Sequence, residues 1–305
     1  MSELRNTLKN RIQKAVSLAP YTTFHLGGDA ELFLETHTEE ELAEAVRMAR
    51  DEGWSYFLLG GGSNLVVSDK GVSGLVIRNH AENSDFVDVS HGLITLSSGW
   101  PLAYAVGLAW KHSLSGFETF TGIPGTVGGA IYGNAGAYGR CVGDLLVSAD
   151  ILTPEGEIKT VGSDFFQFAY RTSLLKSVQH IVLKATFRVS PGDPAVIRAR
   201  IKDIAAQRHS KHPPKEVGSA GSFFKNLDQK PGETQRRAAG EFLEKAGAKE
   251  IVVGGASVYA KHANFIVNYG EASASDVRSL ASILKQKVFE LFGIELHEEV
   301  IYVGR

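Results

Sequence analysis

The residues best suited to bind a ligand are in the loop 60–64, Gly-Gly-Gly-Ser-Asn, between the apolar runs 57–59 and 65–67. Glycine backbone can approach a ligand closely and take positive φ, so successive N–H groups can point into one anion-sized hollow. The spacing fits neither the dinucleotide fingerprint nor the P-loop. No Lys or Arg lies between Arg50 and Lys70, so backbone N–H groups would supply the attraction. We expect a diphosphate here; the alternative is a tight connection between strands.

A second glycine-rich stretch covers residues 121–139. Gly122, Gly125 and Gly128 recur at every third position, and aromatic residues and Asn134 interrupt the pattern. Single glycine turns are common, but this density over nearly twenty residues is hard to explain by turns alone. The stretch therefore favours a large planar ligand that passes close to the backbone, with a series of turns as the alternative.

Composition excludes several classes of function. Of the 305 residues, 43% are hydrophobic and 22% charged, and 32 basic residues nearly balance 34 acidic ones. This balance gives no global attraction to nucleic acid or to an anionic membrane, and no obligatory protein partner is evident. The single cysteine, Cys141, excludes an internal disulfide and a zinc site built on paired thiolates, so no metal site is expected.

The N-terminus carries charges where a signal peptide needs its apolar core, and no apolar run of about 18 residues occurs. We therefore expect a cytoplasmic protein without membrane insertion.

Hydrophobic periodicity predicts an α+β protein. Its helices are expected at 3–18, 38–50 (capped by Thr38 and Glu41), 101–111, 195–209, 234–246 and 275–292. Strands are expected at 30–35, 56–59, 75–77, 86–89, 93–97, 146–152, 158–161, 181–189, 251–253, 265–267 and 298–302. The segment 190–194, Ser-Pro-Gly-Asp-Pro, has the composition of a linker and is the best domain boundary.

Seven ordered blocks resemble the UDP-N-acetylenolpyruvoylglucosamine reductases of bacterial cell-wall synthesis, also called UDP-N-acetylmuramate dehydrogenases. The blocks are 21–24 (Tyr-Thr-Thr-Phe), 60–64, 122–125 (Gly-Ile-Pro-Gly), 134–139 (Asn-Ala-Gly-Ala-Tyr-Gly), 170–171 (Tyr-Arg), 221–226 (Gly-Ser-Phe-Phe-Lys-Asn) and 299–300 (Glu-Val). Because they are spread over most of the chain, the resemblance is specific.

The resemblance implies an FAD-binding domain of the p-cresol methylhydroxylase and vanillyl-alcohol oxidase type, at 1–192, with subdomains of about 1–80 and 81–192. It implies a smaller α+β substrate domain at 193–305, whose last strand, about 295–304, returns to the FAD domain. The implied reaction is the NADPH-driven reduction of UDP-N-acetylglucosamine enolpyruvate, with non-covalent FAD, in peptidoglycan precursor synthesis.

The resemblance also implies a catalytic trio of Arg171, Ser222 and Glu299. A fixed guanidinium at Arg171 would stabilise the charge that grows on the enolpyruvyl carboxylate after hydride transfer. Ser222 would donate the proton to C2. Glu299 would act protonated, with its pKa raised in a dry site; it is chosen over Glu298 because it directly precedes Val300 in the motif.

The binding residues follow from the same blocks. Those for the cofactor are Tyr21, Thr22, Gly60, Gly61, Gly62, Ser63, Asn64, Gly122, Ile123, Pro124, Gly125, Thr126, Gly128, Gly129, Asn134, Ala135, Gly136 and Ala137. Those for the substrate are Tyr170, Lys211 and Asn226, with Arg208 as a further candidate, and the segment 261–264 is a candidate for nucleotide contact.

About fifty residues separate Arg171 from Ser222, which resembles the subclass that lacks an extra substrate-covering loop. Two alternatives stay open: a flavoprotein oxidase of the same superfamily and a non-catalytic nucleotide-binding module. His25, His80 and Cys141 are candidates for covalent flavin attachment, but none sits in a supporting motif, so dissociable FAD is expected.

Overall fold

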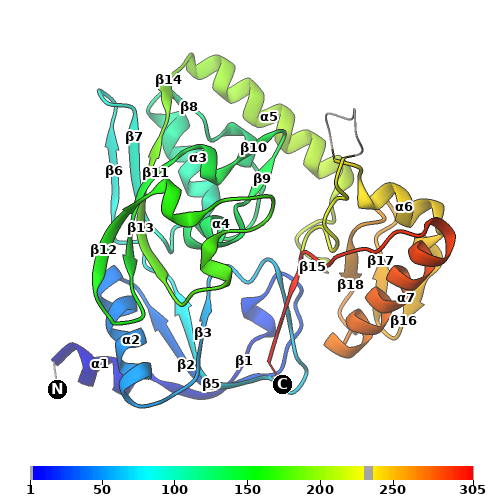
Figure 1. The fold of residues 1–305 in the computed structure, drawn as a ribbon, viewed down its shortest axis with the longest axis horizontal. Helices are drawn as coiled ribbons and strands as arrows, with labels where there is room; N and C mark the ends of the chain where they lie inside the picture. The colour runs from blue at the N-terminus through cyan, green and yellow to red at the C-terminus, as the bar shows by residue number, and fades with distance from the viewer. Residues whose placement is uncertain (1–2, 230–235, 305) are drawn as a thin grey trace. The chain divides into compact units, whose positions relative to one another are not determined.

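A computed structural model describes residues 3–229 and 236–304, and the chain forms two compact units (Figure 1). Unit 1 consists of 1–14, 32–61 and 74–208, and unit 2 of 15–31, 62–73 and 209–305. Unit 1 thus continues past the predicted linker, and unit 2 includes two N-terminal segments. The domain limits of 1–192 and 193–305 are a prediction about domains, which these compact units do not test.

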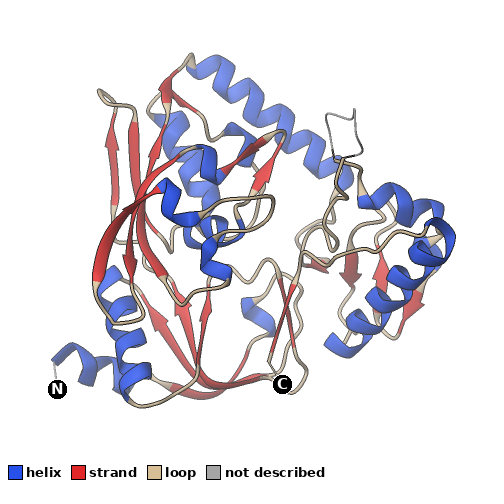
Figure 2. Ribbon diagram, viewed as in Figure 1, coloured by secondary structure: helices blue, strands red, loops and turns tan. Residues whose placement is uncertain are grey.

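The larger sheet of unit 1 is antiparallel and has the strand order β12-β11-β13-β7-β6 (Figure 2). Helices α3 and α4 cover a core that includes Ile94, Phe117 and Phe187. The strands are β6 (Asp85–Asp88), β7 (Leu93–Ser97), β11 (Leu146–Leu152), β12 (Ile158–Gly162) and β13 (Ile181–Arg188). The helices are α3 (Leu102–Lys111), α4 (Val127–Gly133) and α5 (Pro194–Lys211), and the short strands are β8 (Leu114–Ser115), β9 (Gly136–Ala137), β10 (Arg140–Cys141) and β14 (Ser190–Pro191).

A second sheet contains β2 (Asp29–Thr36), β5 (Val72–Asn79) and β3 (Tyr56–Leu59), with β1 (Gln13–Ser17) at its edge. Strand β3 runs parallel to β5, with Leu59 opposite Arg78. Helix α2 (Glu39–Asp51) buries Leu42, Val46 and Ala49. Its N-cap is Thr38, whose side chain accepts a hydrogen bond from the N–H of Glu41, as the sequence predicts, whereas the carboxylate of Glu41 accepts from the N–H of His37 rather than of Thr38.

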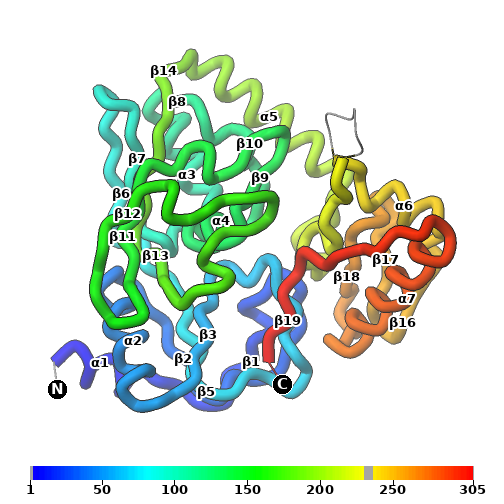
Figure 3. The backbone as a smooth tube through the Cα atoms, viewed as in Figure 1, coloured from blue at the N-terminus to red at the C-terminus, as the bar shows by residue number. Residues whose placement is uncertain are grey.

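The sheet of unit 2 has the order β15-β18-β17-β16, and helix α7 packs against β16 and β17. Strand β19 (Ile301–Val303) runs parallel to β4 (Leu65–Val67), so the last strand joins an N-terminal segment within this unit (Figure 3). The other elements are β15 (Gly218–Ser219), α6 (Ala239–Lys245), β16 (Val252–Val253), β17 (Ala256–Val258), β18 (Ile266–Asn268) and α7 (Ala274–Phe292).

Three sequence predictions are wrong in detail. The helix expected at 3–18 is α1 (Glu3–Arg11), because the chain turns into β1 and Ala15 has φ 52°, which a right-handed helix does not allow. The glycine-rich stretch was not expected to be helical, but it contains α4. The helix expected at 234–246 is α6 (Ala239–Lys245), which begins later than predicted; residues 234–235 lie outside the described residues.

Among residues 3–229 and 236–304, none of the helices combines the length and the apolar character needed to cross a bilayer.

Candidate active site

Both glycine-rich loops contribute to one hollow in unit 1. Gly60 and Gly61, directly after β3, line it together with Gly125 and Thr126, and its volume is about 220 Å³. A Cβ on Gly60 would lie 2.8 Å from Thr126 Oγ1, and a Cβ on Gly61 would lie 2.6 Å from the Cα of Gly125. Because real Cβ atoms do not approach backbone so closely, the contact of Gly61 with Gly125 requires glycine at position 61, whereas at position 60 the side chain of Thr126 would have to move.

Ionisable side chains complete the wall of the hollow. Arg78, His80 and Glu82 line it, with Asn79, Gly99 and Pro101. The sequence argument that backbone N–H groups act without a cation was therefore incomplete, because β5 brings Arg78 opposite Leu59, the last residue of β3. The carboxyl ends of parallel strands meet at one edge of a sheet. A prediction that β3 and β5 are parallel would therefore have placed Arg78 next to the first glycine-rich loop.

The remainder of the first loop belongs to unit 2. Gly62 has φ 60°, and a Cβ there would lie 2.1 Å from the carbonyl oxygen of Tyr21. The N–H of Thr23 donates to the carbonyl of Gly62 at 3.2 Å. Asn64 Nδ2 donates to the carbonyl of Glu299 at 2.9 Å. Tyr21, Thr22, Gly62 and Asn64 are thus held together by local packing within this unit.

Helix α4 organises the second glycine-rich stretch. Thr126 is its N-cap and accepts from the N–H of Gly129 at 3.2 Å. Asn134, its C-cap, is 4% exposed and has a left-handed backbone with φ 43°. The amide of Asn134 donates to the carbonyl of Ala169 at 2.9 Å and accepts from Gly143 N at 3.0 Å. The side chain of Asn134 therefore ties the glycine-rich stretch to the segment that carries Arg171.

Arg171 lies in a tight hairpin turn with a left-handed backbone. Ala169 and Thr172 exchange backbone hydrogen bonds of 3.1 and 3.2 Å, which leaves Tyr170 and Arg171 at the tip. Arg171 has φ 56°, a conformation that is uncommon for any residue other than glycine and costs free energy. The carbonyl of Arg171 accepts from Lys176 Nζ at 2.8 Å, and its guanidinium carbon lies 5.5 Å from the centroid of the Tyr170 ring.

Arg208, at the end of unit 1, reaches the second glycine-rich loop. Its Nε donates to the carbonyl of Gly122 at 3.2 Å. Burial lowers the pKa of Arg208, and the nearby positive charge of Arg171 lowers it further, while Tyr138 opposes this shift. Two guanidinium groups within electrostatic reach of each other favour an anionic ligand between them.

In unit 2, backbone hydrogen bonds join the segments that carry Ser222 and Glu299. The N–H of Glu299 donates to the carbonyl of Phe223 at 2.8 Å. The N–H of Lys225 donates to the carbonyl of His297 at 2.8 Å. Both Ser222 and Glu299 are partly buried, whereas Phe223 and Phe224 fill the core behind them. Glu298 Oε1 lies 3.8 Å from Lys285 Nζ.

Asn264 holds the backbone of the segment next to Ser222, and the sequence motifs do not single it out. It is 3% exposed, and its side chain accepts from Phe224 N at 2.9 Å and donates to Phe224 O at 2.8 Å. Its carbonyl accepts from Phe223 N at 2.8 Å. A buried asparagine in the apolar segment 263–267 was the only signal in the sequence, and it did not identify the partner.

The predicted substrate residues have diverse surroundings. Lys211 is exposed, and its charge lowers the pKa of His262, after a larger effect of burial in the same direction. Asn226 is exposed, and its Oδ1 accepts from Ala239 N at 3.2 Å. Tyr170 is partly buried in the hairpin of unit 1. The roles of all these site residues stay predictions.

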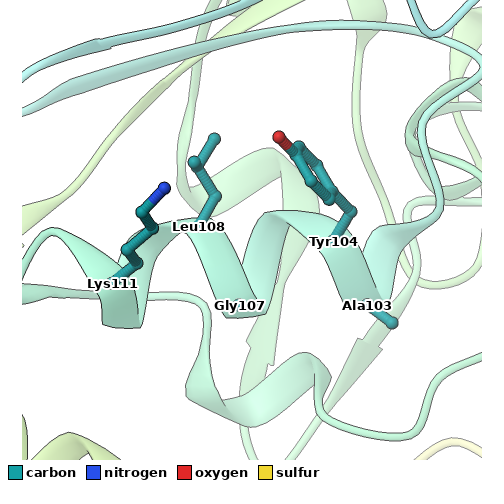
Figure 4. A pocket seen from close by; sticks show the side chains of 5 residues that line it. All are labelled: Ala103, Tyr104, Gly107, Leu108 and Lys111. Carbon is teal, nitrogen blue, oxygen red and sulfur yellow. The ribbon is translucent and has the colours of Figure 1, made fainter.

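A further hollow of about 320 Å³ lies over helix α3, lined by Ala103, Tyr104, Gly107, Leu108 and Lys111 (Figure 4). A hydrogen bond to Asp85 raises the pKa of Tyr104 to about 12, so its phenol stays protonated at neutral pH. The walls of this hollow come from one helix and contain none of the predicted site residues.

Comparison with known proteins identifies the class first. Residues 30–162 match the family model of an FAD binding domain, and this range contains both glycine-rich loops. Residues 212–303 match the model described as the C-terminal domain of UDP-N-acetylenolpyruvoylglucosamine reductase. The chain is thus an α+β flavoprotein with an FAD-binding domain and a separate C-terminal domain, as the sequence predicts.

Individual relatives identify the family. The chain is 39% identical over 297 residues to the UDP-N-acetylenolpyruvoylglucosamine reductase of Nostoc sp., covering 96% of this chain and 86% of that protein. It is 40% identical over 287 residues to the enzyme of the same name from Exiguobacterium sibiricum, covering 94% and 91%. The crystal structure of UDP-N-acetylenolpyruvylglucosamine reductase from Thermus caldophilus matches with a TM-score of 0.79 at 32% identity, covering 96% and 99%. The chain belongs to the UDP-N-acetylenolpyruvoylglucosamine reductase family.

Proposed function

We propose that this protein reduces UDP-N-acetylglucosamine enolpyruvate to UDP-N-acetylmuramate, with non-covalent FAD as resident cofactor and NADPH as reductant, in cytoplasmic peptidoglycan precursor synthesis. Family membership supports the reaction, and the glycine-walled hollow supports the cofactor. The observation that carries the proposal is the hydrogen bond from Glu299 N to Phe223 O, because it fixes two predicted catalytic segments side by side. We also assign the chain to the subclass without the extra substrate-covering loop.

The cofactor would be held by the loops 60–64 and 122–126, with Gly60, Gly61 and Gly125 at the closest approach. When bound, FAD supplies hydride transfer from NADPH to the methylene carbon of the enolpyruvyl group. Backbone N–H groups of the loops would stabilise its pyrophosphate through charge-assisted hydrogen bonds, which contribute about 1.5 to 3 kcal/mol each. Arg78 adds a positive charge at the same hollow.

Protein side chains would then manage the charge and the proton. Arg171 binds the carboxylate of the enolpyruvyl group and stabilises the negative charge that grows on it. Ser222 donates its hydroxyl proton to C2. Glu299, protonated in a partly dry site, shares a proton with the developing dianion. Lys211, Asn226 and Tyr170 hold the UDP-sugar, and Arg208 adds a second cation near Arg171.

The test is a pair of half-reactions under anaerobic conditions with the purified protein. We expect a flavin absorbance spectrum, bleaching on addition of NADPH, and recovery of the spectrum when the enolpyruvyl UDP-sugar is added. UDP-N-acetylglucosamine, which lacks the enolpyruvyl group, is the control and should leave the flavin reduced. Bleaching by NADPH without reoxidation by the enolpyruvyl sugar would contradict the proposed substrate, and reoxidation by oxygen alone would favour an oxidase.

A further inference from the structure

Unit 1 contains a cluster of side chains beside the glycine-walled hollow, and the proposed reaction gives these side chains no chemical role; His80 also lines that hollow. Glu35, His37 and His80 each offer a ligand atom, and these atoms all lie within 4.8 Å of one another. His80 Nδ1 lies 2.9 Å from Glu35 Oε1, and the rings of His37 and His80 have centroids 5.7 Å apart. No metal site is predicted from the sequence, where the single Cys141 excludes paired thiolates and these three residues do not form a metal motif.

Strand geometry explains why the three side chains converge. Glu35 is in β2 and His37 follows two positions later, so both side chains point to one face. His80 follows the end of β5, and its N–H donates to the carbonyl of Thr36 at 2.9 Å. This bond places His80 next to Thr36, which lies between Glu35 and His37 in the sequence. The backbone pairing of the two segments therefore brings Glu35 and His80 together, and the exposed His37 completes the group.

The donor atoms suit a zinc ion. Zinc binds imidazole nitrogen and carboxylate oxygen at about 2.0 to 2.2 Å in a tetrahedron, which separates neighbouring ligand atoms by about 3.3 Å. The observed 2.9 Å between His80 Nδ1 and Glu35 Oε1 is close to this value. His37 is exposed, so its side chain can approach without disturbing the core. Three protein ligands leave a fourth position for water.

A second carboxylate, that of Glu82, contacts the other ring nitrogen of His80. His80 Nε2 lies 3.0 Å from Glu82 Oε1. Histidines that bind a metal through one nitrogen commonly donate the other N–H to a carboxylate, which fixes the tautomer and strengthens the ligand. Glu82 is in the position that this arrangement requires, and it is 27% exposed at its side chain.

The local charges are compatible with a dication. Glu35 and Glu82 carry two negative charges, and Arg78, whose Nη1 lies 3.1 Å from Glu35 Oε1, carries one positive charge. With both histidines neutral, the cluster has a net charge of minus one before a metal binds. The competing arrangement is a direct contact of His80 with Glu35 and Glu82, which needs no metal.

We propose that Glu35, His37 and His80 form a zinc-binding site, with Glu82 orienting His80. The test is a zinc titration of the flavin-loaded protein against a chromophoric chelator, after removal of any histidine tag. We expect uptake of one equivalent. His80→Gln and His37→Gln should each abolish this uptake, and Glu82→Gln should weaken affinity about 10- to 100-fold.

His91→Gln is the matched control. His91 Nδ1 also lies 2.7 Å from a carboxylate, that of Asp88, but among the described residues this pair belongs to no group of three possible metal ligands. This variant should bind zinc as the unmodified protein does. A variant is used only if its unfolding midpoint shows that it is folded. If His80→Gln does not fold, His37→Gln still tests the proposal, because His37 is exposed. Equal zinc uptake in His80→Gln and the unmodified protein, or no uptake by the latter, would overturn the proposal.

Discussion

The backbone N–H of Glu299 donates a 2.8 Å hydrogen bond to the carbonyl oxygen of Phe223. This bond joins the last segment of the chain to the residue directly after Ser222. The neighbouring bond from Asn64 Nδ2 to the carbonyl of Glu299 holds the same segment from the other side. These hydrogen bonds involve the backbone next to Ser222 and at Glu299, not the side chains of these two residues. Substitution of either side chain can therefore leave the hydrogen bonds in place, so that the two roles can be tested separately.

Ser222→Ala should stop one half-reaction and spare the other. Because the hydroxyl is the proposed proton donor to C2, reoxidation by the enolpyruvyl sugar should slow about 10²- to 10⁴-fold. Reduction of the flavin by NADPH should be unchanged. Stopped-flow absorbance of both half-reactions measures this, with Ser282→Ala on the exposed face of α7 as control. Equal loss in both half-reactions would indicate a structural role for Ser222.

Asn264→Ala should lower stability and slow the sugar half-reaction together. The substitution leaves the buried N–H and carbonyl of Phe224 without their partner, which costs about 2 to 4 kcal/mol in free energy of unfolding. Urea denaturation measures the loss. Asn264→Asp keeps the acceptor for Phe224 N but loses the donor to Phe224 O, so it should restore part of the sugar half-reaction. If Asn264→Ala were as stable as the unmodified protein, the positioning role would be disproved.

Arg171→Gly should increase stability while it removes activity. Glycine takes φ 56° without steric cost, so the free energy of unfolding should rise by up to about 1 kcal/mol. The sugar half-reaction should be lost with the guanidinium. Arg171→Lys is the matched comparison, because it keeps the charge and the strained backbone but loses the planar fork of donors. If Arg171→Gly were less stable than Arg171→Lys, the strain would not be real.

Sequence reasoning predicted those elements that are specified locally. The helix α2 was predicted because Thr38 and its apolar stripe act within one segment, and strands β3 and β11 were predicted with their observed bounds. Helix α4 was missed because its glycines have low helix propensity, and its stability depends on the cap at Thr126 and on packing.

The candidate site was predictable as motifs but not as contacts. The blocks around Ser222 and Glu299 identified the residues, whereas Asn264 and Arg78 reach the predicted segments only through tertiary pairing of distant strands and loops. Glu35, His37 and His80 show the same limit, because their spacing along the chain does not resemble a metal motif. Such contacts depend on strand register, which no local pattern in this sequence fixes.

Gly129→Ala should separate cofactor binding from protein stability. A Cβ at Gly129 meets only Thr126 Oγ1, at 3.4 Å, so the apoprotein can accept it and should gain about 0.5 kcal/mol from better helix propensity. If the cofactor lies against α4, the methyl group should weaken FAD binding. Fluorescence titration of apoprotein with FAD measures this. Gly107→Ala in α3 is the control, because nothing lies within 4 Å of its Cβ, and it should bind FAD normally.

The free energy of unfolding should fall as the pH falls below about 6.5, because His262 resists protonation in the folded protein. Burial, and then the charge of Lys211, lowers the pKa of His262, and its Nδ1 accepts a hydrogen bond from Asn264 N at 3.2 Å, which protonation of Nδ1 would break. Below its ordinary pKa the unfolded chain binds the proton more readily than the folded one, so the unfolded state gains stability until the folded pKa is passed. His262→Gln should flatten this slope between pH 7 and pH 5 in urea denaturation, since glutamine can accept the same bond without titrating. The exposed His209→Gln should leave the slope unchanged; an unchanged slope in His262→Gln would assign the pH dependence to other groups.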